Sequence, residues 1–113
     1  MILALLLGCA QPEDTADPCA QRDPALSYHN FGEPFLERYC TSCHGSLLEP
    51  SRRFGAPVGV DLDTYADAVL WTERIQARTL DPELPEMPPG GGPTALELER
   101  LQEWVDCDLR RAE

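Results

Sequence analysis

Five cysteines in a chain of 113 residues are the feature that most restricts how this protein can fold. Aromatic residues make up only 7% of the chain, whereas proline and glycine number 11 and 8, so side chains alone can build only a modest hydrophobic core. Short chains of this kind are commonly stabilised by cross-links, a metal or a cofactor, and cysteine can serve all three. We therefore expect the cysteines to hold this fold together.

The length fits a single domain, and the apolar pattern predicts an all-α fold of about three helices joined by long loops. Apolar side chains recur at helical spacing over about 34–43, over about 64–78 and from residue 94 onward. The loops 45–61 and 81–93 are rich in glycine and proline. Two long loops among three short helices make a weak fold by themselves, so something must fill the space between them.

Residues that start helices precede each predicted helix. Pro34 suits the first turn of the first helix, and Asp63 or Thr64 can cap the second. Thr94 followed three residues later by Glu97 predicts a capping box at the start of the last helix.

Residues 40–44 have the sequence Cys-Thr-Ser-Cys-His, in which two cysteines lie one helical turn apart and a histidine follows directly. Two thiols at this spacing can each form a thioether with a different vinyl group of one porphyrin, which leaves the next residue beneath the iron. The pattern is the attachment signature of c-type haem. It predicts that Cys40 and Cys43 bind the haem and that His44 is the proximal iron ligand.

Two other interpretations of the motif are a redox-active C-x-x-C site and a zinc site. A thioredoxin-like redox site needs a strand before the motif, which the sequence does not predict. A zinc site needs further ligands, and the remaining candidates, His29, Cys19 and Cys107, do not form a familiar zinc pattern. The residues therefore favour haem.

Met87 is the candidate for a second iron ligand. The other methionine, Met1, belongs to the apolar N-terminus. Met87 stands in a Pro-Glu-Met-Pro-Pro segment, whose prolines hold the loop extended and present the thioether at low entropic cost. The alternatives are a methionine that only fills a gap in the core, and His29 as the ligand in its place.

Residues 30–110 resemble a small single-haem cytochrome c domain. The resemblance is carried by a helix leading into C-x-x-C-H-G, a Met-Pro-Pro loop and a C-terminal helix with an aromatic residue. It implies a cytochrome c fold wrapped around one covalently bound haem c, which lies between His44 and Met87. It also implies that the first and last helices cross near Tyr39 and Trp104.

The same resemblance assigns roles to the loop that follows His44. The segment 52–57 looks like the part that lines the haem edge. Arg52 or Arg53 would pair a haem propionate, and a loop carbonyl would hold the second ring nitrogen of His44.

The N-terminus carries a separate resemblance. The apolar run 2–7 is too short to span a bilayer, and Leu-Leu-Gly-Cys at 6–9 resembles the lipobox of bacterial lipoproteins. Residues 1–8 would then be a signal segment and Cys9 the lipidated residue. No Lys or Arg precedes the apolar run, so we expect the true start to lie upstream. The alternative is a short buried apolar N-terminus with a free cysteine.

These assignments divide the chain and leave two cysteines. Residues 9–29 are acidic and rich in proline and are expected to form a tether, followed by the cytochrome c domain at 30–113. With Cys9 on lipid and two cysteines on haem, Cys19 and Cys107 remain. Lipidation and haem attachment both occur outside the cytoplasm, where thiols oxidise, so a disulfide between them is the economical pairing. Two free thiols are the alternative.

The expected function is single-electron transfer by a lipid-anchored protein on the periplasmic side of a bacterial membrane, inner or outer. We expect no enzyme activity, because six-coordinate iron leaves no open site for a substrate. The formal net charge of −11 excludes nucleic acid as a partner and favours redox proteins with basic patches. One alternative is a haem-based sensor in which Met87 dissociates to admit a gas. Another is a structural lipoprotein with an accidental motif.

Overall fold

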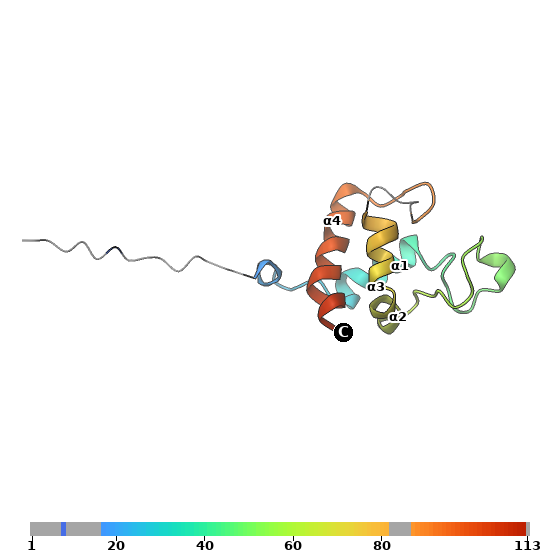
Figure 1. The fold of residues 1–113 in the computed structure, drawn as a ribbon, viewed down its shortest axis with the longest axis horizontal. Helices are drawn as coiled ribbons and strands as arrows, with labels where there is room; N and C mark the ends of the chain where they lie inside the picture. Colours follow the sequence, from blue (N-terminus) through green and yellow to red (C-terminus); the bar gives the residue numbers. More distant parts are fainter. Residues whose placement is uncertain (1–7, 9–16, 82–86, 113) are drawn as a thin grey trace, which may run out of the picture.

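The computed structural model describes residues 8, 17–81 and 87–112, and within these ranges the chain is helical and has no strand (Figure 1). The α-helices are α1 (Glu33–Tyr39), α2 (Tyr65–Leu70), α3 (Thr72–Ile75) and α4 (Ala95–Trp104). Tighter or wider helical turns extend and link them: η1 (Pro18–Ala20), η2 (Tyr28–Gly32), η3 (Pro50–Arg52), η4 (Gln76–Leu80), η5 (Val105–Leu109) and η6 (Arg110–Ala112). The predicted all-α class is confirmed for the described residues.

The first helical rod begins earlier than the sequence predicted. The wide turns of η2 run directly into α1, so the rod starts at Tyr28 and not at Pro34. Ser27 caps this start: its hydroxyl accepts the N–H of Asn30, and the side chain of Asn30 accepts the N–H of Ser27. Pro34, which has no N–H to donate, lies in the first turn of α1 as predicted, just after the wide turns of η2.

The other two rods begin where they were predicted to begin. Thr64 accepts the N–H of Asp67 at 3.1 Å and caps α2, which continues through α3 and η4 with a break in helical geometry at Trp71. Thr94 accepts the N–H of Glu97 at 3.1 Å and caps α4, which continues through η5 and η6. Both caps are reciprocal capping boxes, so the predicted N-cap positions are confirmed.

The hydrophobic core lies where the three rods meet. Its buried apolar side chains are Phe35, Leu36, Leu62, Ala68, Ile75, Leu101, Trp104, Val105 and Leu109. The first and last rods are in tight contact at Gly32, where a Cβ atom would lie 2.3 Å from the ring of Trp104. Trp104 thus lies at this contact as expected, but the residue that meets it there is Gly32 and not Tyr39. Tyr39 lies further along the rod and donates to Glu97 at 2.8 Å.

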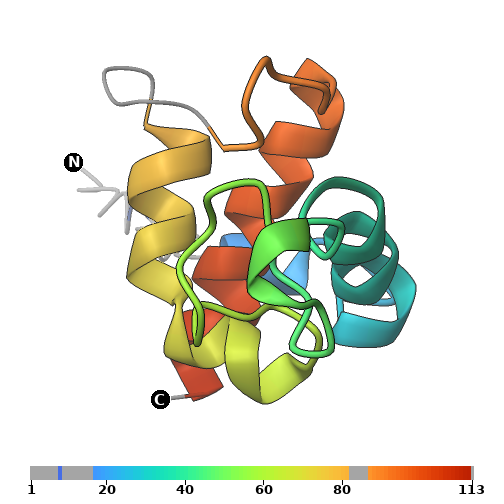
Figure 2. The ribbon, with the colours of Figure 1, turned by 90° about the vertical axis from the view of Figure 1, so that its right-hand side faces the viewer.

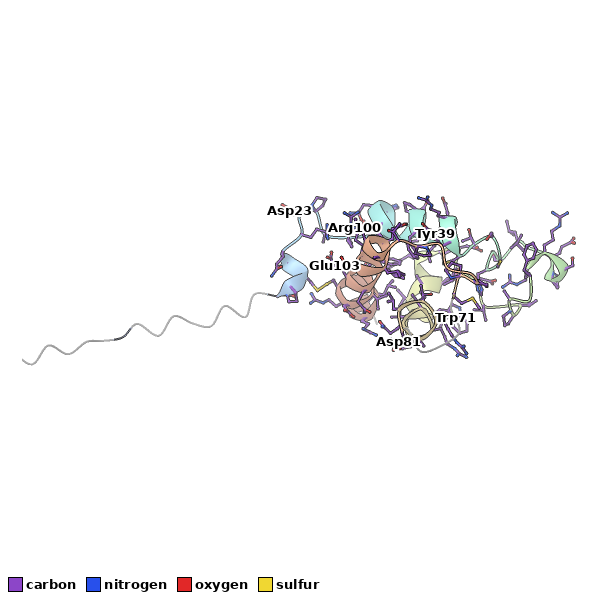
Figure 3. The ribbon with its side chains drawn as sticks, turned by 90° about the horizontal axis from the view of Figure 1, so that it is seen from above. Asp23, Tyr39, Trp71, Asp81, Arg100 and Glu103 are labelled. Atoms are coloured by element: carbon purple, nitrogen blue, oxygen red, sulfur yellow. A yellow bond between two sulfur atoms is a disulfide. The ribbon has the colours of Figure 1, made fainter. Side chains whose placement is uncertain are left out.

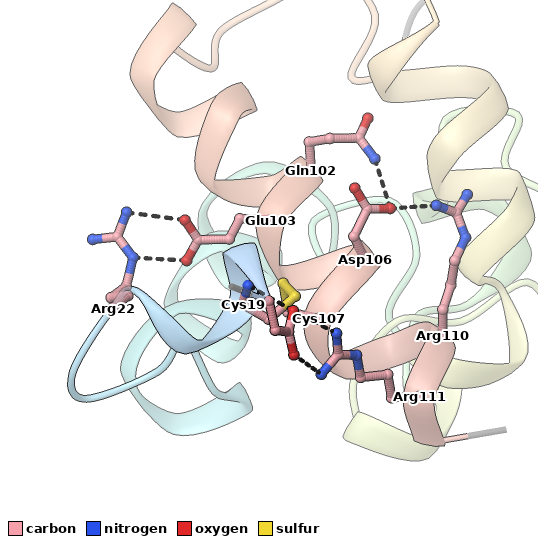
Figure 4. The surroundings of a disulfide bond; sticks show 9 residues. Cys19, Arg22, Gln102, Glu103, Asp106, Cys107, Arg110 and Arg111 are labelled. Carbon is pink, nitrogen blue, oxygen red and sulfur yellow. Dashed lines mark hydrogen bonds and ion pairs between the residues drawn. A yellow bond between two sulfur atoms is a disulfide. The ribbon is translucent and has the colours of Figure 1, made fainter. Parts of the chain in front are cut away.

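The segment 17–27 is attached to the last rod and does not form part of a free tether. Cys19 and Cys107 form a disulfide with their Cα atoms 5.5 Å apart (Figure 4). Two ion pairs flank it, Arg22–Glu103 at 2.7 Å and Asp17–Arg111 at 3.0 Å. The expected tether over 9–29 must therefore be shortened, because the folded unit already includes Asp17. Residues 9–16, together with the proposed lipid site Cys9, lie outside the described residues.

We expect the disulfide to contribute strongly to stability. It closes a loop of 88 residues, which by the chain-entropy model stabilises the fold by at most about 4 to 5 kcal/mol. The double variant C19S/C107S should unfold at a clearly lower denaturant concentration, whereas R22Q, which removes only an exposed ion pair, should leave the unfolding midpoint nearly unchanged.

A digest without reductant should link the peptide that contains Cys19 to the peptide that contains Cys107. Recovering both cysteines alkylated without reductant would contradict the pairing.

Candidate functional site

The segment 40–44 forms a tight turn at the end of α1. The helix ends at Tyr39 and not at Cys43 as predicted, and the N–H groups of Cys43 and His44 donate to the carbonyl of Cys40 at 3.1 and 2.9 Å. Cys40 and Cys43 are free thiols, and both are partly exposed. One short turn therefore presents two thiols and an imidazole together.

The pKa of the Cys40 thiol differs from that of a redox-active cysteine. It packs against the hydrophobic core, and burial, with a further contribution from Cys43, raises the pKa of Cys40 to about 12. Cysteines in redox-active C-x-x-C sites have lowered pKa values, because the thiolate is the reactive form. Cys40 is therefore a neutral thiol at physiological pH, which disfavours the thioredoxin-like interpretation.

This raised pKa predicts slow alkylation of Cys40 in the full chain produced without haem. At pH 8.5 a thiol with a pKa near 12 is ionised to a fraction of roughly 0.0003, whereas an ordinary cysteine is about half ionised. Labelling with iodoacetamide, followed by peptide mass spectrometry, should show Cys40 almost unmodified, with a rate that rises with pH. The same chain unfolded in denaturant is the control. Equal rates in the folded and unfolded chain would contradict the prediction.

One ring nitrogen of His44 is fixed by the loop that follows the motif. Nδ1 lies 2.7 Å from the carbonyl oxygen of Val60. A carbonyl can only accept a hydrogen bond, so Nδ1 must carry the proton and Nε2 keeps a free lone pair. The backbone is tied at the same place, because the N–H of Leu62 donates to the carbonyl of His44 at 2.8 Å. The resemblance implied such a loop carbonyl, and in the structure it is that of Val60.

The loop 45–61 projects from one end of the bundle (Figures 1 and 2) and is organised around the buried side chain of Arg53, which is 2% exposed. Its guanidinium donates to four carbonyls, those of Gly45 at 2.7 Å, Ala56 at 3.3 Å, Pro57 at 2.9 Å and Val60 at 2.9 Å. Nη1 also lies 2.9 Å from Oδ1 of Asp61, an ion pair whose angle is not that of a hydrogen bond.

These contacts correct one expectation about the two loop arginines. Arg53 is fully engaged by the loop and is not free to pair a haem propionate. Arg52 is exposed, and among the described residues its side chain makes no hydrogen bond or ion pair, so it is the arginine that could take this role.

Met87 is 41% exposed in the loop before α4. Its N–H donates to the carbonyl of Arg78 at 2.8 Å. The loop then passes the end of α1, because a Cβ atom on Gly92 would lie 3.4 Å from the ring of Tyr39, the residue before Cys40. The loop that carries Met87 therefore returns to the end of α1, directly before the motif, although residues 82–86 lie outside the described ranges.

His29, the alternative ligand, is exposed on η2, and its ring lies edge-on to Tyr28 with the ring centres 5.8 Å apart. The zinc interpretation loses two of its candidate ligands, because Cys19 and Cys107 are bonded to each other. Residues 17–81 and 87–112 contain no cluster of three or more His, Cys, Asp or Glu side chains arranged to hold a metal ion.

None of the described helices is long and apolar enough to cross a membrane. No family model, no curated protein and no solved structure matches this chain. Its function must therefore be inferred from the site.

Proposed function

We propose that this protein is a c-type cytochrome that transfers single electrons and carries one haem c. The observation that supports this most directly is the turn 40–44. It presents two free thiols, and it presents an imidazole whose Nδ1 is bonded to Val60 so that Nε2 is available. The donor set fits haem, because the thiols of Cys40 and Cys43 match its two vinyl groups and His44 supplies an axial nitrogen. Bound haem would supply the one-electron couple.

Exposed apolar side chains near the motif favour a large apolar ligand at this end of the bundle. Leu47, Phe54 and Val58, three large apolar side chains of the loop 45–61, are all exposed, and exposed apolar surface of this kind often marks a binding site. Met87 is also exposed, and its thioether makes it the proposed second iron ligand. Arg52 is the proposed partner of a propionate.

The role of the polypeptide in this proposal is to hold the iron ligands in a fixed geometry. The hydrogen bond to Val60 keeps a proton on Nδ1 of His44 and orients the ring. The close packing of Gly32 on Trp104 holds the first and last rods together, and the disulfide joins the N-terminal segment to the last rod. Two axial ligands would leave no open position for a substrate, so we propose an electron carrier and not an enzyme.

We also propose that the mature protein is anchored through lipid on Cys9 and faces the periplasm. The disulfide between Cys19 and Cys107 supports this location, because disulfides persist in oxidising compartments. Residues 17–22 are attached to the last rod, so the proposed tether is the short segment 9–16 that precedes them.

The proposed role of Met87 is tested by the visible spectrum of protein made in a host with a cytochrome c maturation system. M87A should remove the weak methionine-to-iron charge-transfer band of the oxidised protein and lower the reduction potential, because a ligand that favours ferrous iron is lost. H29A is the control and should leave both unchanged. The opposite pattern would make His29 the ligand.

Two outcomes of the same preparation would favour the alternatives. Rapid and complete binding of carbon monoxide by the reduced wild-type protein at neutral pH would favour a gas sensor. Absence of any visible absorbance would mean that the motif carries no haem.

The proposed partners are redox proteins with basic patches. The formal charge of −11 lies wholly after residue 8, so removal of the signal segment would not relieve it. Electron-transfer contacts are small and transient, and salt screens charge steering over a Debye length of about 10 Å at 0.1 M.

In stopped-flow measurements, the second-order rate of electron transfer with a basic soluble cytochrome should fall steeply as the salt concentration rises, whereas the rate with an acidic cytochrome should rise or stay flat. An equal salt dependence for both would contradict a steering role.

A further inference from the structure

We propose that Arg53 is a positioning residue for His44. Its guanidinium holds the carbonyl of Val60, and that carbonyl in turn fixes the imidazole ring and the nitrogen that carries its proton. The inference rests on the proposed function and deepens it by assigning a role to a side chain that would not itself touch the iron.

The first support is that the loop engages most of the guanidinium. Arginine carries five N–H groups in a rigid planar fork. In Arg53 four of them donate to loop carbonyls, and Nη1 also forms an ion pair with the carboxylate of Asp61. A buried cation with four donors engaged holds these carbonyls in one arrangement, so the loop shape depends on this side chain.

The second support is the direct link to the histidine. The carbonyl of Val60 accepts from Nδ1 of His44 at 2.7 Å and from Nη2 of Arg53 at 2.9 Å. Its oxygen has two lone pairs, so both bonds form together. Nη1 holds the carbonyl of Gly45, the residue directly after His44, at 2.7 Å. Arg53 therefore fixes both the backbone beside the imidazole and the acceptor that faces its ring.

The third support is the backbone around Arg53. Phe54 has a φ of 51°, in the left-handed region that large side chains rarely adopt. Such a conformation persists where its surroundings impose it. Arg53 bonds to the carbonyls of Ala56 and Pro57 directly after this turn, so the same side chain holds the turn and the acceptor of His44.

A merely structural arginine would stabilise the loop without controlling the protonation site of His44, and this difference provides the test. The full chain, labelled with ¹⁵N and prepared with and without haem, is studied by long-range ¹H–¹⁵N correlation at pH 8, where ordinary imidazoles are neutral. The wild-type protein should show His44 with its proton on Nδ1, protected from solvent exchange. R100Q changes an exposed arginine of α4 that has no role in the proposed site, and it should behave as the wild type does.

In R53Q the Nδ1 proton of His44 should exchange about tenfold faster, the factor expected for one lost hydrogen bond, and a population protonated on Nε2 should appear without haem. R53K keeps the charge, but an ammonium cannot span the carbonyls of Gly45 and Val60 as the fork does, so intermediate exchange is expected. Circular dichroism establishes which variants fold. Wild-type exchange and protonation in both folded variants, or in R53K alone if R53Q does not fold, would overturn the proposal.

The two proposals fail in different ways. Wild-type protein from a maturation host without visible absorbance would refute the haem proposal, and the protonation of His44 in the haem-free chain would still report on Arg53. Attached haem together with unchanged exchange in the Arg53 variants would refute only the positioning role.

Discussion

The hydrogen bond between Nδ1 of His44 and the carbonyl of Val60 is the interaction on which the proposed haem site depends. It decides that Nε2 is the free nitrogen, and it ties the motif to the loop 45–61. That loop exposes Leu47, Phe54 and Val58, so polar contacts with Arg53 give it shape. Removing one partner of a buried charge network costs about 3 to 5 kcal/mol, which makes Arg53 as important to the loop as a core residue is to a helix.

The helical bundle supplies a rigid base for this site. Gly32 allows the first rod to lie directly on Trp104, and Tyr39, one residue before the motif, is bonded to Glu97 at the start of α4. Seen from above, the disulfide that joins the N-terminal segment to the last rod lies at the opposite end of the molecule from the loop 45–61 (Figure 3). The stabilising cross-link and the proposed redox site are thus kept apart.

Features encoded by neighbouring residues could be predicted from the sequence. The caps at Thr64 and Thr94 are local patterns, and so is the motif at 40–44. The start at Ser27 was missed because its capping partner is Asn30 and not the usual Glu or Gln. Attachment of residues 17–22 to α4 and η5 depends on contacts between distant residues, and Val60 acts through its backbone carbonyl, which no side-chain pattern reveals. The sequence marks Arg53 as a candidate partner of a haem propionate, but it does not predict that the side chain is buried.

Covalent haem on Cys40 and Cys43 underlies the whole proposed function, and intact mass spectrometry detects it directly. Protein from a host with a cytochrome c maturation system is weighed after acid acetone extraction, beside the double variant C40A/C43A. The wild-type chain should keep the mass of one haem, whereas the variant should keep none. A wild-type chain with the mass of the polypeptide alone, or one that loses its haem to the solvent, would contradict it.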